Sequence, residues 1–328
     1  MIIVTGGAGF IGSNLVATLM ERGYPQVMVC DRFGTDQKWK NLAKHPIFGH
    51  IPPEELFDWL DSRGPVQAIF HMGAISSTTE TDVDKLLKEN LHFSRKLWLW
   101  CAENRVPFLY ASSAATYGNG NQGYEDDDSL DYLTRLQPLN PYGWSKHLFD
   151  LRVARAVAGD EQNPPHWAGF KFFNVYGPNE YHKGNQCSVV CAKFPEVQAG
   201  NPVRLFKSYR EDFSDGEQKR DFVHVQDCCD IMLWFLEHPE HNGIYNVGTG
   251  QAASFNTLGN AMLNAMGRNA ADIQYINMPE NLQAQYQYFT EASLAKLRAI
   301  GYDVPFISLE DGVKDYVTRH LNTEDPYR

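Results

Sequence analysis

Residues 1–14 read MIIVTGGAGFIGSN, and this stretch decides the fold of the chain. The apolar run at 1–6 predicts a buried strand, and the amphipathic pattern at 13–23 predicts a helix. Three glycines lie between the two, namely Gly6, Gly9 and Gly12. Their spacing permits a tight turn, a close approach of the backbone to a pyrophosphate and close packing of the helix on the strand. The motif predicts a dinucleotide site at the helix N-terminus, the alternative being a tight turn that binds no ligand.

Strand-like and helix-like segments alternate along the rest of the first half. The pattern predicts strands at 27–31, 67–74 and 107–114, and helices at 53–64, 82–105 and 141–158. Further strands are expected at 167–178, 222–227 and 243–248, with a helix at 228–238. Such alternation is typical of right-handed βαβ units in a doubly wound parallel sheet. We therefore expect an α/β protein with a Rossmann domain at 1–173, a return segment at about 222–248, and a smaller α/β substrate-binding domain at 174–328.

Composition and charge narrow the possible partners. The chain has 328 residues, of which 43% are hydrophobic and 21% charged, as in ordinary globular proteins. The net charge of −11 argues against nucleic acid or an anionic membrane as a partner. No signal peptide or membrane-spanning run is apparent, and the six cysteines lack the dense spacing of a disulfide scaffold. Cys187 and Cys191 lie one helical turn apart without a second ligand pair, so we expect reduced thiols, no metal and a cytoplasmic location.

Three charged residues bear on the choice of dinucleotide. Asp31 closes the second expected strand, where an acidic residue usually accepts hydrogen bonds from the adenosine ribose and favours NAD. Arg32 follows directly, and Lys38 lies in the next loop. These two cations are suited to a 2′-phosphate. On these residues alone, NAD and NADP both remain open.

Tyr142 and Lys146 stand four residues apart in the expected helix at 141–158, so their side chains share one face. The phenol of a free tyrosine has a pKa of ~10. A nearby ammonium and an oxidised nicotinamide would both lower this pKa, which makes Tyr142 a candidate general base. Ser113, at the end of the expected strand 107–114, is placed to hold a substrate oxygen. The alternative is a surface Tyr/Lys pair without chemistry.

The glycine motif, SSAATYG at 112–118 and YGWSK at 142–146 resemble the extended short-chain dehydrogenase/reductases, and the resemblance spans nearly the whole chain. Within that family the chain is similar to the epimerases that invert C6 of an ADP-heptose for lipopolysaccharide core synthesis. YGPNEYHKG at 176–184 is the most specific stretch. KRDFVHVQD at 219–227, NVGTG at 246–250 and QYQYFTEASLAKLRAIGY at 285–302 add to it. The resemblance implies one tightly bound NADP per subunit, an ADP-heptose substrate and a homo-oligomer.

The resemblance also implies a role for each matching residue. The implied cofactor contacts, beyond the glycines, are Phe10, Ile11, Asp31, Arg32, Lys38, Met72, Gly73, Ala74, Ile75, Ser76, Asn90, Tyr142, Lys146 and Val175. The implied substrate contacts are Ser113, Asn174, Lys183, Asn185, Phe206, Lys207, Ser208, Arg220 and Tyr286. Ser113, Tyr142 and Lys146 form the implied catalytic set, and Lys183 is the implied second acid/base. The chain departs from the family pattern at Pro53, Arg32 and Asn185 and in a longer loop at 209–219.

The implied reaction is redox-neutral. Hydride leaves C6 for the cofactor and a 6-ketone forms. Because C6 lies outside the sugar ring, rotation about the C5–C6 bond presents the opposite face, to which the hydride returns. The oxygen has then moved, so one group serves each face, Tyr142 on one and Lys183 on the other.

Two alternatives of different kinds are kept. One is another nucleotide-sugar enzyme, such as a 4-epimerase or a 4,6-dehydratase. Dehydratases of this family place an Asp-Glu pair after the catalytic serine or threonine, where this chain has Ala114 and Ala115. The other is an NADP-sensing protein without activity, which would be expected to lose the Tyr/Lys pair.

Overall fold

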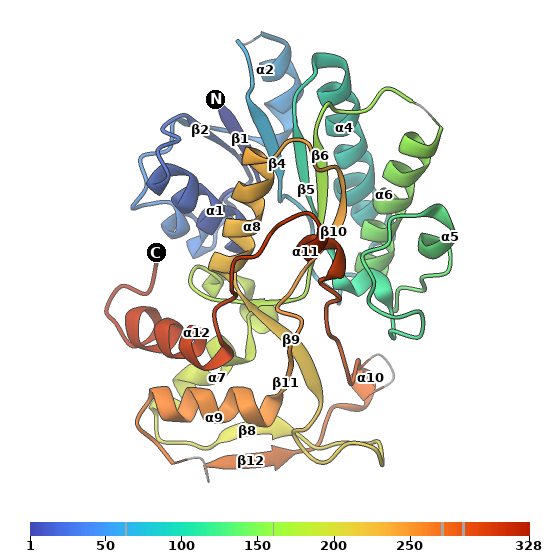
Figure 1. The fold of residues 1–328 in the computed structure, drawn as a ribbon. Helices are drawn as coiled ribbons and strands as arrows, with labels where there is room; N and C mark the ends of the chain where they lie inside the picture. The colour runs from blue at the N-terminus through green and yellow to red at the C-terminus, as the bar shows by residue number, and fades with distance from the viewer. Residues whose placement is uncertain (63, 160, 270–271, 284–285) are drawn as a thin grey trace.

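The computed structural model describes residues 1–328 except 63, 160, 270–271 and 284–285. The chain is built on a seven-stranded sheet in the order β10-β6-β5-β4-β1-β2-β3, in which every neighbouring pair is parallel (Figure 1). Its strands are β1 (Ile2–Thr5), β2 (Val27–Cys30), β3 (Gly49–Ile51), β4 (Ala68–His71), β5 (Phe108–Ser113), β6 (Trp167–Phe172) and β10 (Gly243–Val247). The strand order reverses between β1 and β4, as in a doubly wound sheet. The expected Rossmann-like α/β fold is confirmed.

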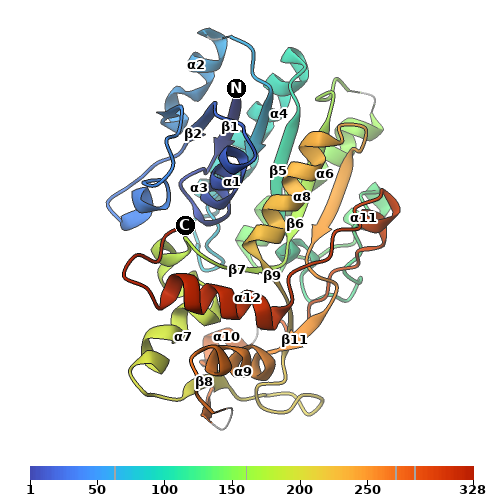
Figure 2. The ribbon, with the colours of Figure 1, turned by 60° about the vertical axis from the view of Figure 1, so that its left-hand side comes forward.

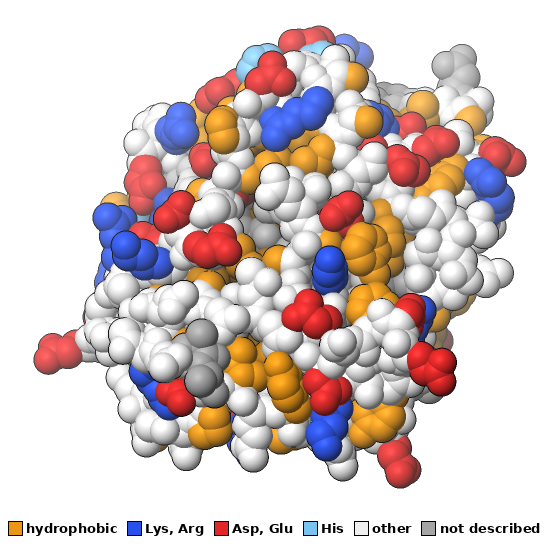
Figure 3. All heavy atoms as spheres, turned by 60° about the horizontal axis from the view of Figure 1, so that its bottom comes forward, with side chains coloured by type: hydrophobic (Ala, Val, Ile, Leu, Met, Phe, Trp, Pro, Cys, Tyr) orange, Lys and Arg blue, Asp and Glu red, His pale blue; other side chains and the backbone are white. Residues whose placement is uncertain are grey.

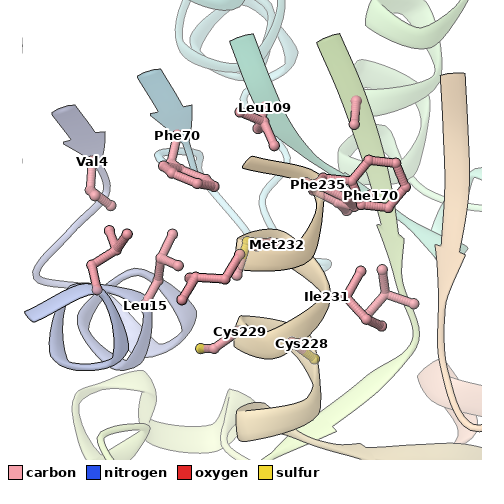
Figure 4. Close-up of a cluster of buried hydrophobic side chains, with 14 of the residues drawn as sticks. Val4, Leu15, Phe70, Leu109, Phe170, Cys228, Cys229, Ile231, Met232 and Phe235 are labelled. Carbon is pink, nitrogen blue, oxygen red and sulfur yellow. The ribbon is translucent and has the colours of Figure 1, made fainter. Parts of the chain in front are cut away.

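Helices cover both faces of this sheet, which explains the continuous apolar runs of its strands. The helices α1 (Phe10–Glu21) and α8 (Val225–Glu237) pack on one face, and α2 (Leu56–Ser62), α4 (Phe93–Asn104) and α6 (Pro141–Ala158) pack on the other. Alternate side chains of β1 enter the two layers, Val4 toward α1 and α8 and Ile3 toward the opposite layer. Figure 4 shows Leu15 of α1 and Met232 of α8 meeting the sheet in this first layer.

A second part of the chain packs below the sheet in Figures 1 and 2. It contains a three-stranded sheet of β11 (Ala252–Ser254), β9 (Lys219–His224) and β7 (Asn174–Tyr176), and the parallel pair β8 (Val203–Phe206) and β12 (Ile273–Ile276). Its longer helices are α7 (Val189–Gln198), α9 (Phe255–Ala265) and α12 (Leu309–Tyr316), which share a separate apolar core. Short helices complete the chain: α3 (Val83–Leu86), α5 (Leu130–Leu133), α10 (Glu280–Gln283) and α11 (Ala295–Ala299).

Several expected elements differ from those observed. The segment 167–178 divides after Phe172 into β6 and β7, which belong to different sheets. The expected return segment at about 222–248 contains β9, α8 and β10. Helix α8 packs on the large sheet and β10 is one of its strands. Strand β9 pairs with β7 and β11 instead, so the expected return of this strand to the large sheet is wrong. The boundary near residue 173 remains a prediction.

The expected long helix at 82–105 is not uniform. It begins as α3, passes through a π-helical stretch, η3 (Leu87–His92), and continues as α4. Such π turns insert an extra residue and are frequent at functional sites. Asn90, which the resemblance implies as a cofactor contact, lies within this stretch.

The surface of the second part mixes charges of both signs. Figure 3 shows acidic, basic and hydrophobic side chains interspersed on the face seen from below in Figure 1. Among the described side chains seen on that face, lysines and arginines alternate with acidic and apolar side chains and do not gather into one basic field. Among the described residues, none of the helices is both long and apolar enough to cross a bilayer.

Candidate active site

A cavity of about 590 Å³ lies at the carboxyl ends of β1, β2, β4 and β5, beside the point where the strand order reverses. Open α/β sheets bind their ligands at this place. All the expected cofactor residues except Asn90 line it: Gly6, Gly9, Phe10, Ile11, Gly12, Asp31, Arg32, Lys38, Met72, Gly73, Ala74, Ile75, Ser76, Tyr142, Lys146 and Val175. The catalytic candidates Ser113 and Lys183 line the same cavity.

The glycine turn leaves no room for side chains. Gly6 has φ +66°, a backbone conformation that favours glycine. A Cβ atom on Gly12 would lie 2.1 Å from the carbonyl oxygen of Gly6. The first turn of α1 can therefore approach β1 closely and presents its free backbone N–H groups to the cavity. This cradle fits the pyrophosphate of a dinucleotide.

The charged residues after β2 form a compact network. One carboxylate oxygen of Asp31 accepts a hydrogen bond from the Ala8 N–H at 2.9 Å, and the other accepts one from Lys38 Nζ at 2.6 Å. The Arg32 guanidinium, about half exposed, pairs with Glu54 at 2.6 Å and with Glu89 at 3.1 Å. Lys38 is therefore held over the Asp31 carboxylate, while Arg32 is held toward the glutamates.

Asn90 does not line the cavity. It is fully buried, and its side-chain amide pairs with the backbone of Ile75, accepting from the N–H at 2.8 Å and donating to the carbonyl at 3.0 Å. Its Nδ2 also donates to Ser145 Oγ at 3.0 Å. Asn90 thus joins the wall after β4 to α6, and its role as a cofactor contact stays a prediction.

Tyr142, Lys146 and Ser113, the expected catalytic set, all line the cavity. Pro141 opens α6 and Asn140 caps it, the Asn140 side chain accepting from the Gly143 N–H at 2.8 Å, so Tyr142 lies in the first turn. Lys146 follows one turn later and donates from Nζ to the Ala111 carbonyl at 2.9 Å. The structure brings these three residues to the same cavity as the glycine turn.

Burial controls the titration of this set. It raises the pKa of Tyr142, and the hydrogen bond with Ser113 offsets part of the rise. Burial also lowers the pKa of Lys146 to about 8, with the Asp150 carboxylate opposing the fall. The fall in the pKa of Tyr142 that the sequence predicts is therefore not present in the protein by itself. We expect it only when the positive nicotinamide lies beside the phenol.

A buried ion pair lies beneath the catalytic set. Lys171 of β6 and Asp150 of α6 pair at 2.6 Å, and both side chains are 0% exposed. Asp150 also accepts from Ser112 Oγ at 2.7 Å and Tyr110 Oη at 3.1 Å, and Lys171 donates to Thr116 Oγ1 at 2.7 Å. Such a pair is tolerable only where its remaining hydrogen bonds are satisfied. Asp150 is thereby fixed four residues after Lys146 on the same helix.

Lys183 reaches the cavity beside Phe10, the first residue of α1. It lies in the short helical segment η5 (Tyr181–Gln186), and its ammonium is 5.2 Å from the centre of the Phe10 ring. Its side chain is half-buried, and no carboxylate of a described residue forms an ion pair with it. Gln186 Nε2 donates to Ser77 Oγ at 2.7 Å, which joins this segment to the wall after β4. The lysine is thus directed into the cavity by contacts on both sides.

The other expected substrate residues do not line this cavity. Arg220 is 7% exposed, and its guanidinium stacks 5.0 Å from the centre of the Tyr286 ring, whose own neighbour is Phe206 at 6.4 Å. The Gln218 side chain donates to the carbonyl of Lys207 at 3.3 Å, and the Ser208 N–H donates to Asp215. These residues therefore form a second polar and aromatic cluster beyond the cavity. Asn174 and Asn185 are exposed.

Several lining residues escaped the sequence prediction. They are Thr5, Cys30, Asp36, Ser77, Glu89, Phe93, Ala111, Ser112, Phe172, Phe173, His182 and Gln186. Glu89 and Phe93 are four residues apart on the expected helix at 82–105, so the spacing alone predicts that they share one face. The others come to the cavity only through the folding of distant segments. Among the described residues, none of the groups of histidine, cysteine and acidic side chains is arranged to hold a metal ion.

Known proteins resemble the chain along its full length. The profile of the NAD dependent epimerase/dehydratase family matches residues 2–248. The ADP-L-glycero-D-manno-heptose-6-epimerase of Fusobacterium nucleatum subsp. nucleatum is 47% identical over 335 residues, which cover 100% of both chains. The crystal structure of ADP-L-glycero-D-manno-heptose-6-epimerase from Helicobacter pylori has a TM-score of 0.80 at 28% identity and covers 97% of this chain and 95% of its own.

A solved structure with a bound dinucleotide is also similar. The UDP-glucose 4-epimerase of Thermus thermophilus in complex with NAD has a TM-score of 0.73 at 26% identity. The match covers 95% of this chain and 96% of that one. The similarity extends across the glycine turn, the cavity and the second part of the chain.

Proposed function

The chain belongs to the NAD dependent epimerase/dehydratase family, and from this premise we propose that it converts ADP-D-glycero-D-manno-heptose to ADP-L-glycero-D-manno-heptose, for lipopolysaccharide core biosynthesis. It is an isomerase, and the relatives that carry this activity in their names match it from end to end. The observation that carries the proposal is that Tyr142 and Lys183 line one cavity together with the glycine turn.

The residues of the chain divide the work between two faces of C6. A nicotinamide dinucleotide, when bound, takes hydride from C6 and gives it back. Tyr142, as phenolate, removes the hydroxyl proton on one face, and Ser113 holds the same oxygen. Lys146 stabilises the phenolate by its charge. After rotation about the C5–C6 bond, the oxygen lies on the opposite face, where the Lys183 ammonium donates the proton.

Incubation with ADP-D-glycero-D-manno-heptose tests the proposed function directly. We expect the C6 epimer to accumulate to equilibrium, as followed by proton NMR. In deuterium oxide the product should retain protium at C6, because the hydride returns from the cofactor and not from solvent. UDP-glucose and UDP-galactose serve as controls. Interconversion of those two sugars without any reaction of the heptose would make the chain a 4-epimerase.

We propose that the cofactor is NADP, bound tightly at one per subunit. The Asp31 oxygen that would accept from a ribose hydroxyl already accepts from Lys38 Nζ and from the Arg32 N–H at 2.7 Å. Lys38 thereby places an ammonium at the end of β2, where it would pair with the 2′-phosphate of NADP. Arg32 contributes less, because two glutamates hold its guanidinium.

Heat-released nucleotide from the purified protein should therefore be NADP or NADPH by mass spectrometry. Lys38→Ala should weaken NADP binding by about 10- to 100-fold, since a charge-assisted hydrogen bond contributes about 1.5–3 kcal/mol. Arg32→Ala is the comparison and should have a smaller effect. Release of NAD alone would contradict this assignment and would leave Asp31 as the residue that selects the cofactor.

A further inference from the structure

Residues 326–328, here named the C-terminal strap, contact the segment that carries Lys183. In Figures 1 and 2 the end marked C lies beside α1. The Tyr181 hydroxyl donates to the Pro326 carbonyl at 2.7 Å, and the Tyr181 and Tyr327 rings meet edge to face at 5.1 Å. The Arg328 N–H donates to Asn179 Oδ1 at 3.0 Å. The strap therefore binds the segment 179–181 immediately before Lys183.

The Arg328 side chain anchors the strap to α1. Its guanidinium donates to Thr18 Oγ1 at 3.0 Å and to Glu21 Oε2 at 2.8 Å. The side chain is only 17% exposed, although its partner Glu21 is 56% exposed. A partly buried, charge-assisted contact of this kind is stronger than an ordinary surface ion pair. Arg328 thus joins the Lys183 segment to the helix that begins with the glycine turn.

The start of the segment is held in a special backbone conformation. Asn179 is fully buried and has φ +72°, in the left-handed region. Its Nδ2 donates to Ser13 Oγ at 3.1 Å, and its carbonyl accepts from Asn41 Nδ2 at 3.1 Å. A residue in this region persists where its surroundings fix it, and the strap supplies the partner of Oδ1. The direction in which the chain leaves Asn179 sets the position of Lys183 four residues later.

We propose that Arg328 and Tyr181 are positioning residues for Lys183, an inference that rests on the proposed role of Lys183 in proton transfer. The strap restricts the 179–183 segment so that the ammonium lies over Phe10, within the cavity. Displacement of an acid/base group by about 1 Å can cost on the order of 10²-fold in rate. The strap itself contributes no atom to the cavity lining.

Arg328→Ala and Tyr181→Phe test the proposal in the full chain with its cofactor. We expect either change to lower kcat about 10-fold while KM and retained cofactor stay near the wild-type values. Tyr181→Phe keeps the ring and so guards against a loss of folding. Arg268→Ala is the matched control. The Arg268 guanidinium likewise donates to the carbonyl of Val197 at 2.7 Å and pairs with Asp272 at 2.9 Å, but it lies outside the cavity. The kcat of Arg268→Ala should therefore equal that of the wild type.

A double-mutant cycle separates positioning from general support of the fold. Because Arg328 acts through Lys183, adding Arg328→Ala to Lys183→Met should cause no further loss in kcat. Hydrogen exchange of peptide 179–186, measured by mass spectrometry, should be faster in Arg328→Ala than in the wild type or Arg268→Ala. If the losses in kcat of the two single variants add in the double variant, the positioning role of Arg328 is wrong. The same holds if Arg328→Ala changes neither kcat nor the hydrogen exchange of peptide 179–186. Neither result would bear on the proposed role of Lys183. A near-normal kcat in Lys183→Met would instead overturn the proposed role of Lys183, and the inference with it.

Discussion

Replacing Tyr142 by phenylalanine is expected to lower kcat by ~10²–10⁴-fold, the usual loss when a general acid–base is removed. The substitution keeps the ring in the first turn of α6 and removes only the hydroxyl that hydrogen-bonds Ser113. Folding should therefore persist, with a loss of about 0.5–1.5 kcal/mol for the missing hydrogen bond. The content of bound dinucleotide should be retained, because the turn at Gly6 and Gly12 is unchanged.

The measurement is kcat and KM for ADP-heptose by NMR or coupled chromatography, with the melting temperature of each protein. Tyr132→Phe is the control, because the Tyr132 hydroxyl is also hydrogen-bonded, accepting from the Glu125 N–H at 3.1 Å, but lies outside the cavity. Its activity should be near that of the wild type. A Tyr142→Phe enzyme that epimerises at the wild-type rate would remove Tyr142 from the mechanism.

Because the catalytic set is buried, the ability of Tyr142 to act as a base should depend on the bound cofactor. Burial raises the pKa of Tyr142 and lowers that of Lys146 to about 8, so the protein alone does not favour the phenolate. The positive charge needed to favour it comes with the oxidised nicotinamide. Tyr142 should therefore act as a base when an oxidised nicotinamide lies beside its phenol.

The sequence predicts those parts of the site in which the functional residues lie close together along the chain. The three glycines, and the four-residue spacing of Tyr142 and Lys146, fix their geometry within a single turn or helix. The structure places all of them around one cavity. The alternation of strands and helices likewise predicts the large sheet, because βαβ connections have one hand.

The parts that the sequence does not predict depend on contacts between distant segments. Lys171 reads as one polar residue in an apolar strand, and only the fold brings it to Asp150. Asn90 is a cofactor contact only by resemblance, and no local pattern shows that it lies in a π-helical stretch with its amide paired to the backbone of Ile75. The strand expected at 222–227 overlaps β9, which belongs to the three-stranded sheet and not to the large one. Its pairing with β7 follows from the break after Phe172, which no local signal marks.

Replacing Lys183 by methionine is expected to lower kcat by ~10²–10⁴-fold with little change in KM, because the second face of C6 would lose its proposed proton donor. Methionine keeps much of the length and apolar stem of the side chain, so it should still pack near Phe10. Lys193→Met is the control, since Lys193 lies on the neighbouring helix α7, outside the cavity. Its kcat should be unchanged. Loss of Lys146, by contrast, should also weaken cofactor binding.

Lys183→Arg distinguishes proton transfer from attraction of the substrate diphosphate. Arginine keeps the positive charge but does not release a proton in proteins, so if Lys183 is an acid/base, kcat should stay low in Lys183→Arg and KM should stay near the wild-type value. If Lys183 only attracts phosphate, the methionine variant should show a raised KM that is less sensitive to salt, and arginine should recover most of the activity. A lysine without either role should tolerate both changes, as exposed charges generally do. Its half-buried position in the cavity that Tyr142 also lines, without an ion-pair partner among the described residues, favours the first outcome.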